Sequence, residues 1–250
     1  MPDATPCRHS GLTRTYARGM SKVLRKAPPP TRRQEFSAST KRALVDVAAD
    51  LFTAQGYAGT SLDEIVSGAD VTKGALYHHF SGKQALFEAV FEKVEEHACD
   101  KIRQAVGEHP DPWQKALTGL REFLAVVQEP SYRRIVIQEG PAVLGYERYR
   151  EQEERSSFSI VQEIVSAVLD SYGLEPSMVE TFSRVFFGAM SAAGSAVSAA
   201  EDTGRASAEA EAAMVFILSG LRQQAESGVT LPGPGDLVAD EAPGRGDVAG

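Results

Sequence analysis

Two adjacent histidines, a tyrosine and two lysines stand close together in the stretch VTKGALYHHFSGK, residues 71–83. Imidazoles can ligate a metal or move protons, whereas ammonium and phenol groups can bind phosphate. A metal site is disfavoured because neighbouring helix positions point about 100° apart and no third ligand stands at a suitable spacing. We interpret His78 as a phosphate or solvent contact and His79 as a packed or backbone-bonded histidine, with no metal and no cofactor.

Three helices are predicted around this stretch. In the first, an apolar stripe repeats at helical spacing, Ser39 or Thr40 can provide the N-cap, and Gly56 ends the helix. Ser61 and Glu64 have capping-box spacing and open a short second helix. The residues expected to point inward from these two helices are Leu44, Val47, Ala48, Leu51, Phe52, Ile65, Val66 and Ala69.

The third predicted helix covers Lys73 to Phe80 and follows a tight turn at Asp70, a residue type that tolerates left-handed backbone. Thr72 can cap this helix, while Leu76 and Phe80 face inward. Two short helices joined by a tight turn form a helix-turn-helix, whose second helix enters the major groove of DNA. The residues that this arrangement predicts at the DNA are Thr72, Lys73, Gly74, Tyr77, His78 and Lys83.

The longer stretch TSLDEIVSGADVTKGALYHHFSGKQALFEAVF resembles the DNA-binding signature of the TetR/AcrR family of bacterial transcriptional regulators, and the match runs from about Thr40 to Phe91. The resemblance implies that Thr40, Thr60 and Ser61 also contact the DNA backbone. It further implies a homodimer, a palindromic double-stranded operator and an unidentified small-molecule effector. Two departures from the family pattern are Asp70, where many relatives have glycine, and Asp63, where some have arginine.

The charge of the chain is unevenly distributed. The net charge is −8 overall, but residues 1–35 carry eight basic against two acidic side chains, and residues 36–83 are nearly balanced. A basic arm in front of an acidic body would attract a phosphate backbone to one end of the molecule. We therefore expect residues 1–36 to form a disordered basic arm that supports DNA binding, and residues 37–83 to form the DNA-binding domain.

Residues 84–228 are expected to form a helical effector-binding and dimerisation domain, followed by a disordered tail over 229–250 rich in Gly, Pro and Asp. A helix from Lys83 to Pro110, a second closed by Pro130, a short segment before Gly140-Pro141, a long helix to about Tyr172 and two final helices bring the total to about nine. No strand or repeat is evident. The fold class is thus all-α, with an N-terminal three-helix head and a C-terminal helical domain.

The family resemblance implies two further sites in this body. The candidate residues for a ligand pocket are its aromatic side chains, Trp113, Phe123, Tyr132, Tyr146, Tyr149, Phe158, Phe182 and Phe187, with the segment 138–150 close by. The candidate residues for a dimer interface lie on the last two helices and are Phe186, Ala189, Ala193, Val197, Met214, Ile217, Leu218 and Leu221. Aromatic and apolar stripes of this kind also form ordinary protein cores.

The function we predict is a DNA-binding regulator, a repressor released by a ligand, that acts in the cytoplasm at the nucleoid. Two cysteines cannot build a disulfide framework, and no apolar run reaches the length of a membrane span. An enzyme is disfavoured because the sequence lacks a G-x-S-x-G elbow, a P-loop and an H-E-x-x-H motif. The alternatives are a helical adaptor whose head no longer binds DNA, and a ligand-independent regulator or activator.

Overall fold

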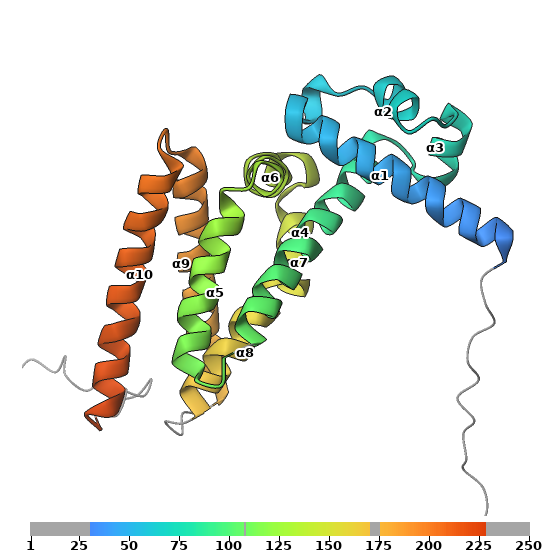
Figure 1. The fold of residues 1–250 in the computed structure, drawn as a ribbon. Coiled ribbons are helices and arrows are strands. Elements are labelled where there is room, and N and C mark those ends of the chain that lie inside the picture. The colour runs from blue at the N-terminus through green and yellow to red at the C-terminus, as the bar shows by residue number, and fades with distance from the viewer. Residues whose placement is uncertain (1–30, 108, 171–175, 229–250) are drawn as a thin grey trace, which may run out of the picture.

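The computed structural model describes residues 31–107, 109–170 and 176–228, and these contain ten α-helices, one π-helical segment and no strand. The head and the body are distinct in Figure 1, where the helix α4 descends from the first into the second. The predicted all-α architecture is confirmed. Within the described residues, no helix is both long and apolar enough to cross a bilayer. The predicted tail over 229–250 and the first thirty residues of the predicted arm lie outside the described residues.

The head consists of α1 (Arg32–Gly59), α2 (Leu62–Gly68) and α3 (Lys73–His79). The predicted inward residues form its core: Leu44, Ala48, Phe52, Ile65, Val66, Leu76 and Phe80 are buried, and Val47, Leu51 and Ala69 pack against them. Gly68 matters for this packing, because a Cβ there would lie 2.8 Å from Cγ1 of Val47. The smallest residue therefore lets α2 lie directly on α1.

The prediction for the start of α1 was wrong. The helix begins at Arg32 rather than at residue 39 or 40, so residues 32–36 are helical and do not belong to a disordered arm. Thr31 is the N-cap, and it forms a capping box with Gln34. The added first turns carry two exposed arginines, Arg32 and Arg33, and project beyond the rest of the head (Figure 1).

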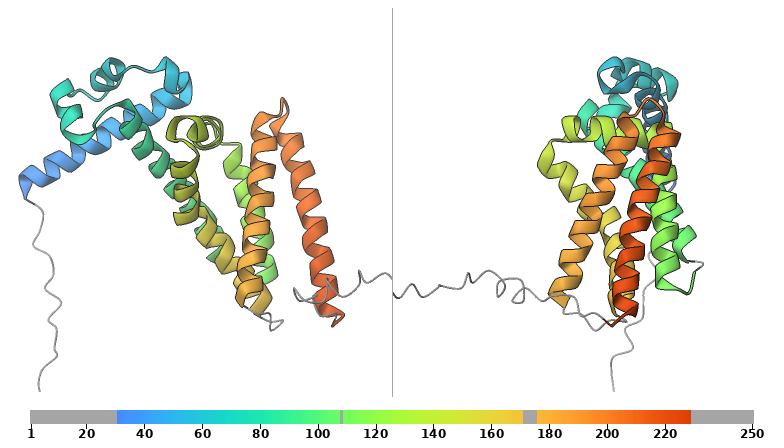
Figure 2. Two further views of the ribbon diagram at one scale, coloured as in Figure 1. Left: turned by 180° about the vertical axis from the view of Figure 1, so that it is seen from behind. Right: turned by 90° about the vertical axis from the view of Figure 1, so that its left-hand side faces the viewer.

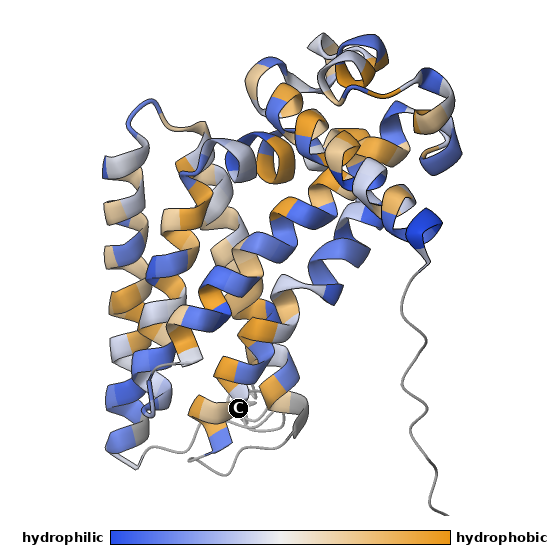
Figure 3. Ribbon diagram, turned by 45° about the vertical axis from the view of Figure 1, so that its right-hand side comes forward, coloured by the Kyte–Doolittle hydropathy of each residue, from blue (hydrophilic) through white to orange (hydrophobic). Residues whose placement is uncertain are grey.

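The body consists of α4 to α10 and the π-helix η1, arranged as a bundle of long helices with shorter ones between them (Figure 2). Its elements are α4 (Lys83–Gly107), α5 (Pro112–Val127), η1 (Tyr132–Glu139), α6 (Gly140–Leu144), α7 (Tyr146–Arg155), α8 (Ser157–Asp170), α9 (Pro176–Ala199) and α10 (Thr203–Glu226). The long helices carry a hydrophobic and a hydrophilic stripe (Figure 3), as expected of amphipathic helices around a core.

The long helix predicted up to Tyr172 is divided into three. Gly145 has φ of 82° and separates α6 from α7, and Ser156 leaves helical geometry between α7 and α8. The left-handed backbone at Gly145 strains any residue that carries a Cβ, which explains the glycine at this break. These breaks let α7 and α8 cover different parts of the bundle.

Candidate DNA-binding surface and ligand cavity

The turn between α2 and α3 has the geometry of a helix-turn-helix. Asp70 has φ of 52° and is the only non-glycine residue with positive φ among those described, which confirms the predicted left-handed turn. The Ser61–Glu64 capping box at the start of α2 is present, and Oγ1 of Thr72 accepts a hydrogen bond from the Ala75 amide at the start of α3. The caps and the turn therefore fix α3 at a defined angle to α2.

One face of α3 is buried and the other is open to solvent. Leu76 is buried against the head, whereas Tyr77 is 59% exposed and His78 is exposed beside it. Gly74 is also exposed, and a Cβ there would meet only the Thr72 hydroxyl at 3.8 Å, so no neighbour within the chain requires a glycine. The outer face of α3, defined here as Thr72, Lys73, Gly74, Tyr77 and His78, forms one continuous surface.

Lys73 on this face is not free. Its Nζ lies 2.6 Å from Oδ1 of Asp63 on α2, with both side chains well exposed. The neighbouring carboxylate raises the pKa of Lys73, first by hydrogen bonding and then by charge attraction. The departure at Asp63 from the family pattern thus has a structural consequence, because any phosphate bound by Lys73 must compete with Asp63.

The other residues predicted to contact DNA differ in their exposure and in their partners within the chain. Thr60 is 2% exposed and its hydroxyl donates a 2.9 Å hydrogen bond to the Gly56 carbonyl, so its side chain cannot reach DNA. Ser61 is exposed, although its hydroxyl already bonds Glu64 at 2.7 Å. Thr40 is partly exposed on α1. Lys83 at the start of α4 lies over the Tyr57 ring, with Nζ 4.4 Å from the ring centroid.

The two histidines lie next to each other at the end of α3. The rings of His78 and His79 meet at 71° with centroids 5.2 Å apart, and no group of three potential ligands occurs among the described residues. His79 is half-buried next to Phe80, and burial lowers the pKa of its imidazole, assisted by the nearby His78 and Lys41. This environment matches the packed histidine predicted from the sequence.

The body contains a partly open cavity of about 370 Å³ between η1 and helices α4, α5 and α7 to α10. Its volume lies in the range of pockets that hold drug-sized molecules. Six of the eight predicted pocket residues line it, namely Trp113, Phe123, Tyr132, Tyr149, Phe182 and Phe187. Tyr146 does not, because its side chain is 72% exposed. Phe158 is also outside, since its ring packs edge-on against Phe187 with centroids 5.5 Å apart.

Sequence reasoning missed most of the aliphatic wall and one acid. Ile160, Val161, Ile164, Val165, Val168 and Leu169 of α8 line the cavity, together with Glu153 at the end of α7. The inward stripe of α8 was visible in the sequence, but nothing in it separates a cavity wall from a filled core. No pattern in the sequence indicated that Glu153 lies in the cavity wall, because charged residues on amphipathic helices are expected on the outside.

Ionisable groups gather at the end of the cavity where α7 leads into α8. Burial raises the pKa of Glu153 and of the Tyr132 and Tyr149 phenols, and Tyr149 shares a hydrogen bond with Glu153. Behind them, Glu95 of α4 is 2% exposed, and burial raises the pKa of its carboxyl to about 7. The Ser157 hydroxyl donates to Oε1 of Glu95 at 3.4 Å.

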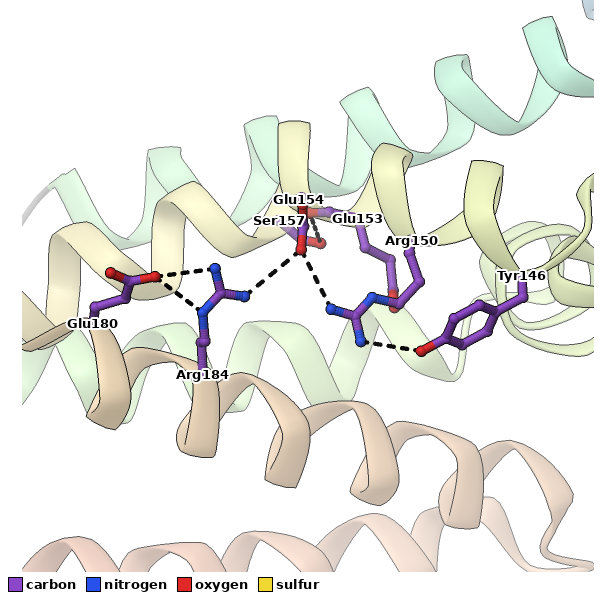
Figure 4. A network of polar contacts seen from close by, with 7 residues as sticks. All are labelled: Tyr146, Arg150, Glu153, Glu154, Ser157, Glu180 and Arg184. Atoms are coloured by element: carbon purple, nitrogen blue, oxygen red, sulfur yellow. Dashed lines mark hydrogen bonds and ion pairs between the residues drawn. The ribbon is translucent and has the colours of Figure 1, made fainter.

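An ion-pair network covers the outside of this region (Figure 4). Arg150 of α7 binds the Tyr146 hydroxyl and Oε1 of Glu154, at 3.5 and 3.3 Å. Arg184 of α9 reaches the same Glu154 oxygen at 3.6 Å and also pairs with Glu180. The network therefore ties α7 to α9 across the outer surface, and Tyr146 belongs to this network rather than to the cavity.

The predicted dimer residues do not form a single outer face. Val197 and Met214 are 1% and 7% exposed within one protomer, so they cannot bury further area against a partner, and their prediction was wrong. Phe186, Met214, Leu218 and Leu221 line the cavity, and Ala189 packs against the core. Ala193 is half-buried, and Ile217 is 50% exposed. The large apolar residues open to solvent on α9 and α10 are Val185, Phe216 and Ile217.

Both the helix-turn-helix head and the cavity-bearing body match models of known protein families. Residues 44–90 match the family model described as bacterial regulatory proteins of the TetR family, and residues 113–221 match a tetracycline repressor-like C-terminal domain. The HTH-type transcriptional regulator AcrR of Shigella flexneri is 37% identical over 97 residues, which are 38% of this chain and 43% of the relative. The TetC protein of transposon Tn10 from Escherichia coli is 33% identical over 113 residues, 45% of this chain and 57% of the relative.

The chain thus spans about half the length of these two curated relatives. A solved structure covers more of it: a TetR-family transcriptional regulator from Pectobacterium atrosepticum shares 26% identity with a TM-score of 0.67, over 77% of this chain and 97% of that one. The two family models lie on the helix-turn-helix head and on the cavity-bearing body, and together they cover more than half of the chain. The protein belongs to the TetR family of bacterial transcriptional regulators, which are not enzymes.

Proposed function

We propose that this protein is a repressor that binds a palindromic operator as a homodimer, acts in the cytoplasm and leaves the DNA when a small molecule enters the cavity. The observation that carries the proposal is the outer face of α3, which is exposed while the opposite side of the helix is anchored by Leu76. Lys73 and Tyr77 on that face suit guanine edges or phosphates. The turn at Asp70 and the caps of both helices hold this face rigidly.

A route from cavity to head supports the release step. The π-helix η1 contributes Tyr132 and Ile137 to the cavity wall. At its last residue, Glu139 accepts a hydrogen bond from the Tyr57 amide at the end of α1. A ligand that prefers one arrangement of η1 would therefore shift the equilibrium between two placements of the head.

The homodimer is supported by the surface of α9 and α10. Phe216 is 81% exposed and Val185 63% exposed, and these neighbouring helices also expose small residues such as Gly188 and Ala192. Small residues permit a close approach of helices, and an exposed apolar surface favours association.

Light scattering should show that Phe216→Glu lowers the molar mass from dimer to monomer. The control Phe36→Glu, at a residue 76% exposed on α1, should leave the dimer intact.

DNA binding is tested by fluorescence anisotropy of the purified protein with the intergenic DNA upstream of its own gene, beside a scrambled duplex and over a salt series. Selective, salt-dependent binding should be lost in Lys73→Ala and Tyr77→Ala, whose side chains make no contribution to the core. Tyr146→Ala removes another exposed tyrosine, this one from the body, and should bind as the original chain does. If the upstream DNA and fragments selected from the genome are bound no better than the scrambled duplex, the protein is not a sequence-specific regulator.

Release is tested with the cavity filled by a side chain. Ala116→Phe places a phenyl ring in the cavity wall, and Ala125→Phe places the same ring on the exposed side of the same helix. A ligand that releases DNA from the original chain and from Ala125→Phe should fail to release it from Ala116→Phe. Equal release from all three would place the effector outside this cavity.

A further inference from the structure

The wall of the cavity carries acid but no base. Among the described residues that line it, Glu153 is the one carboxylate, and lysine, arginine and histidine are absent. The remaining polar side chains are the phenols of Tyr132 and Tyr149 and three serines, Ser157, Ser191 and Ser195. All other wall residues are apolar or aromatic. The cavity therefore offers one carboxylate and several hydroxyl groups in an otherwise apolar wall.

The two ends of the cavity differ in character. Glu153 and Ser157 lie at the junction of α7 and α8, with the fully buried Glu95 behind Ser157. Trp113, Leu169 and Leu221 lie at the other end, where α5 begins and α8 and α10 end. The cavity thus has a polar end near Glu153 and an apolar, aromatic end near Trp113.

The nearest guanidinium groups are bound elsewhere. Arg150 is close enough to lower the pKa of Glu153, but its guanidinium pairs with Glu154, as does that of Arg184 (Figure 4). At the opposite end, Arg222 lies over the Trp113 ring at 5.9 Å and pairs with Glu226 at 2.8 Å. Arg150 and Arg184 border a second, smaller hollow that Glu153 also lines, but neither they nor Arg222 line the cavity itself.

A second polar group faces the same space without a partner. Tyr132 is 7% exposed, lines the cavity and makes no side-chain hydrogen bond to any residue that the structure describes. No fully buried side-chain nitrogen or oxygen among the described residues lacks a hydrogen-bond partner, so the Tyr132 hydroxyl is open to the space of the cavity. Tyr132 and Glu153 line the same cavity, and the two groups are close enough for the Glu153 charge to act on the Tyr132 phenol.

We propose that the cavity binds a lipophilic organic cation, such as a protonated amine on an aromatic or alkyl body, with the cation between Glu153 and Tyr132. This inference rests on the proposed function only in taking the cavity as the effector site. Charge-assisted hydrogen bonds to carboxylate are stronger than neutral ones, and the aromatic side chains can also face a cation. A carboxylate or phosphate ligand would instead meet Glu153 with no base in the wall.

Calorimetry with three probes of one shape tests the charge: 4-phenylbutylamine, 4-phenylbutanol and 4-phenylbutyrate. The purified full-length protein should bind the amine at least tenfold more tightly than the alcohol, and the acid most weakly. Glu153→Gln should remove most of the amine's advantage and leave the affinity for the alcohol within about twofold. Glu151→Gln removes the same charge from the exposed side of α7 and should change neither affinity.

The outcomes separate this inference from the proposed function. Equal affinity for amine and alcohol, or tighter binding of the acid, overturns the inference and leaves the cavity as a binding site. Absence of binding by all three overturns the inference as well. Tight binding of the amine, lost in Glu153→Gln, with no change in DNA affinity supports the inference and contradicts the proposed release mechanism.

Discussion

Oε2 of Glu139, in the body, accepts a hydrogen bond of 2.8 Å from the backbone amide of Tyr57, in the head. The other carboxylate oxygen accepts from Nε of Arg134 at 3.0 Å, and the Glu139 side chain is only 18% exposed. The contact lies just beyond Gly56, whose φ of 76° interrupts α1. One carboxylate thus holds the end of α1 to the element that also lines the cavity.

Glu139→Ala should lower the free energy of unfolding by about 1–2 kcal/mol, because the Tyr57 amide loses its partner in a partly buried place. It should also weaken the effect of a cavity ligand on DNA affinity, since the head is no longer attached to η1 there. Urea denaturation and anisotropy with and without ligand measure the two effects. Glu147→Ala, at an exposed position of α7, serves as the control. Full coupling in Glu139→Ala would show that the signal reaches the head by another contact.

Asp63→Asn should strengthen DNA binding by about twofold to fivefold, because it releases Lys73 from a weak, exposed ion pair. The slope of log K against log salt should steepen by about 0.9, the value for one more neutralised phosphate. Asp46→Asn gives the control, since Asp46 pairs with Lys93 of α4 at 2.6 Å and the charge change is the same. An equal gain in both variants would indicate general electrostatics and not the release of Lys73.

The left-handed backbone conformation at position 70 should decide which residue type gives the more stable protein. Asp70→Ala should cost about 1–2 kcal/mol, because a left-handed conformation is strained for a residue with a Cβ and without a short polar side chain. Asp70→Gly should be at least as stable as the original chain, since glycine adopts this conformation without strain. Thermal unfolding measures the order of the three. Alanine as stable as glycine would mean that the turn adjusts to the substitution.

Glu95 should make the protein less stable as the pH rises through the range from about 4.5 to 7. Burial raises the pKa of this carboxyl in the folded state to about 7, so the folded state binds more protons than the unfolded state between the two values. The groups close to it are Glu153, Tyr132, Tyr149, Cys99 and the hydroxyls of Ser156 and Ser157, none of them a cation. The contribution is present below pH 4.5 and is lost above pH 7, and it amounts to about 3 kcal/mol at most.

Glu95→Gln should therefore be more stable than the original chain at pH 8, and this advantage should be smaller at pH 5. Denaturation by urea at the two pH values provides the measurement. Glu96→Gln, on the exposed side of the same helix, should follow the original chain at both. A pH dependence that Glu95→Gln retains in full would assign it to other groups, of which Glu153 is the first to test.

The sequence was sufficient for the head because local signals there agree with one another. The apolar stripe of α1, the Ser61–Glu64 box and Asp70 each constrain only a few residues, yet together they allow one arrangement. Thr31 and Gln34 have the same capping-box spacing, but they stand beside a run of prolines and arginines that favours a disordered arm. In the body, Gly145 and Ser156 interrupt an apolar period that continues across them, so the period alone suggested one helix.

Side-chain roles that depend on tertiary contacts were beyond the sequence. Thr60 has the residue type and position of a phosphate contact, but its hydroxyl is used by the Gly56 carbonyl. Val197 and Met214 belong to an apolar stripe, and only the packing of α9 and α10 decides that they face the protomer's own core. In the sequence, Glu153 and Glu95 stand where amphipathic helices carry solvated charges. Only the packing of α4, α7 and α8 against one another covers them.

The sequence contains a single tryptophan, Trp113, and this residue lies in the wall of the cavity. The intrinsic emission of the protein therefore originates at one known point, without contributions from a second indole. Because indole emission shifts with the polarity of its surroundings, filling or emptying the cavity is visible as a change in colour and intensity. The protein can thus report its own occupancy in solution without a label, a radioactive ligand or any DNA.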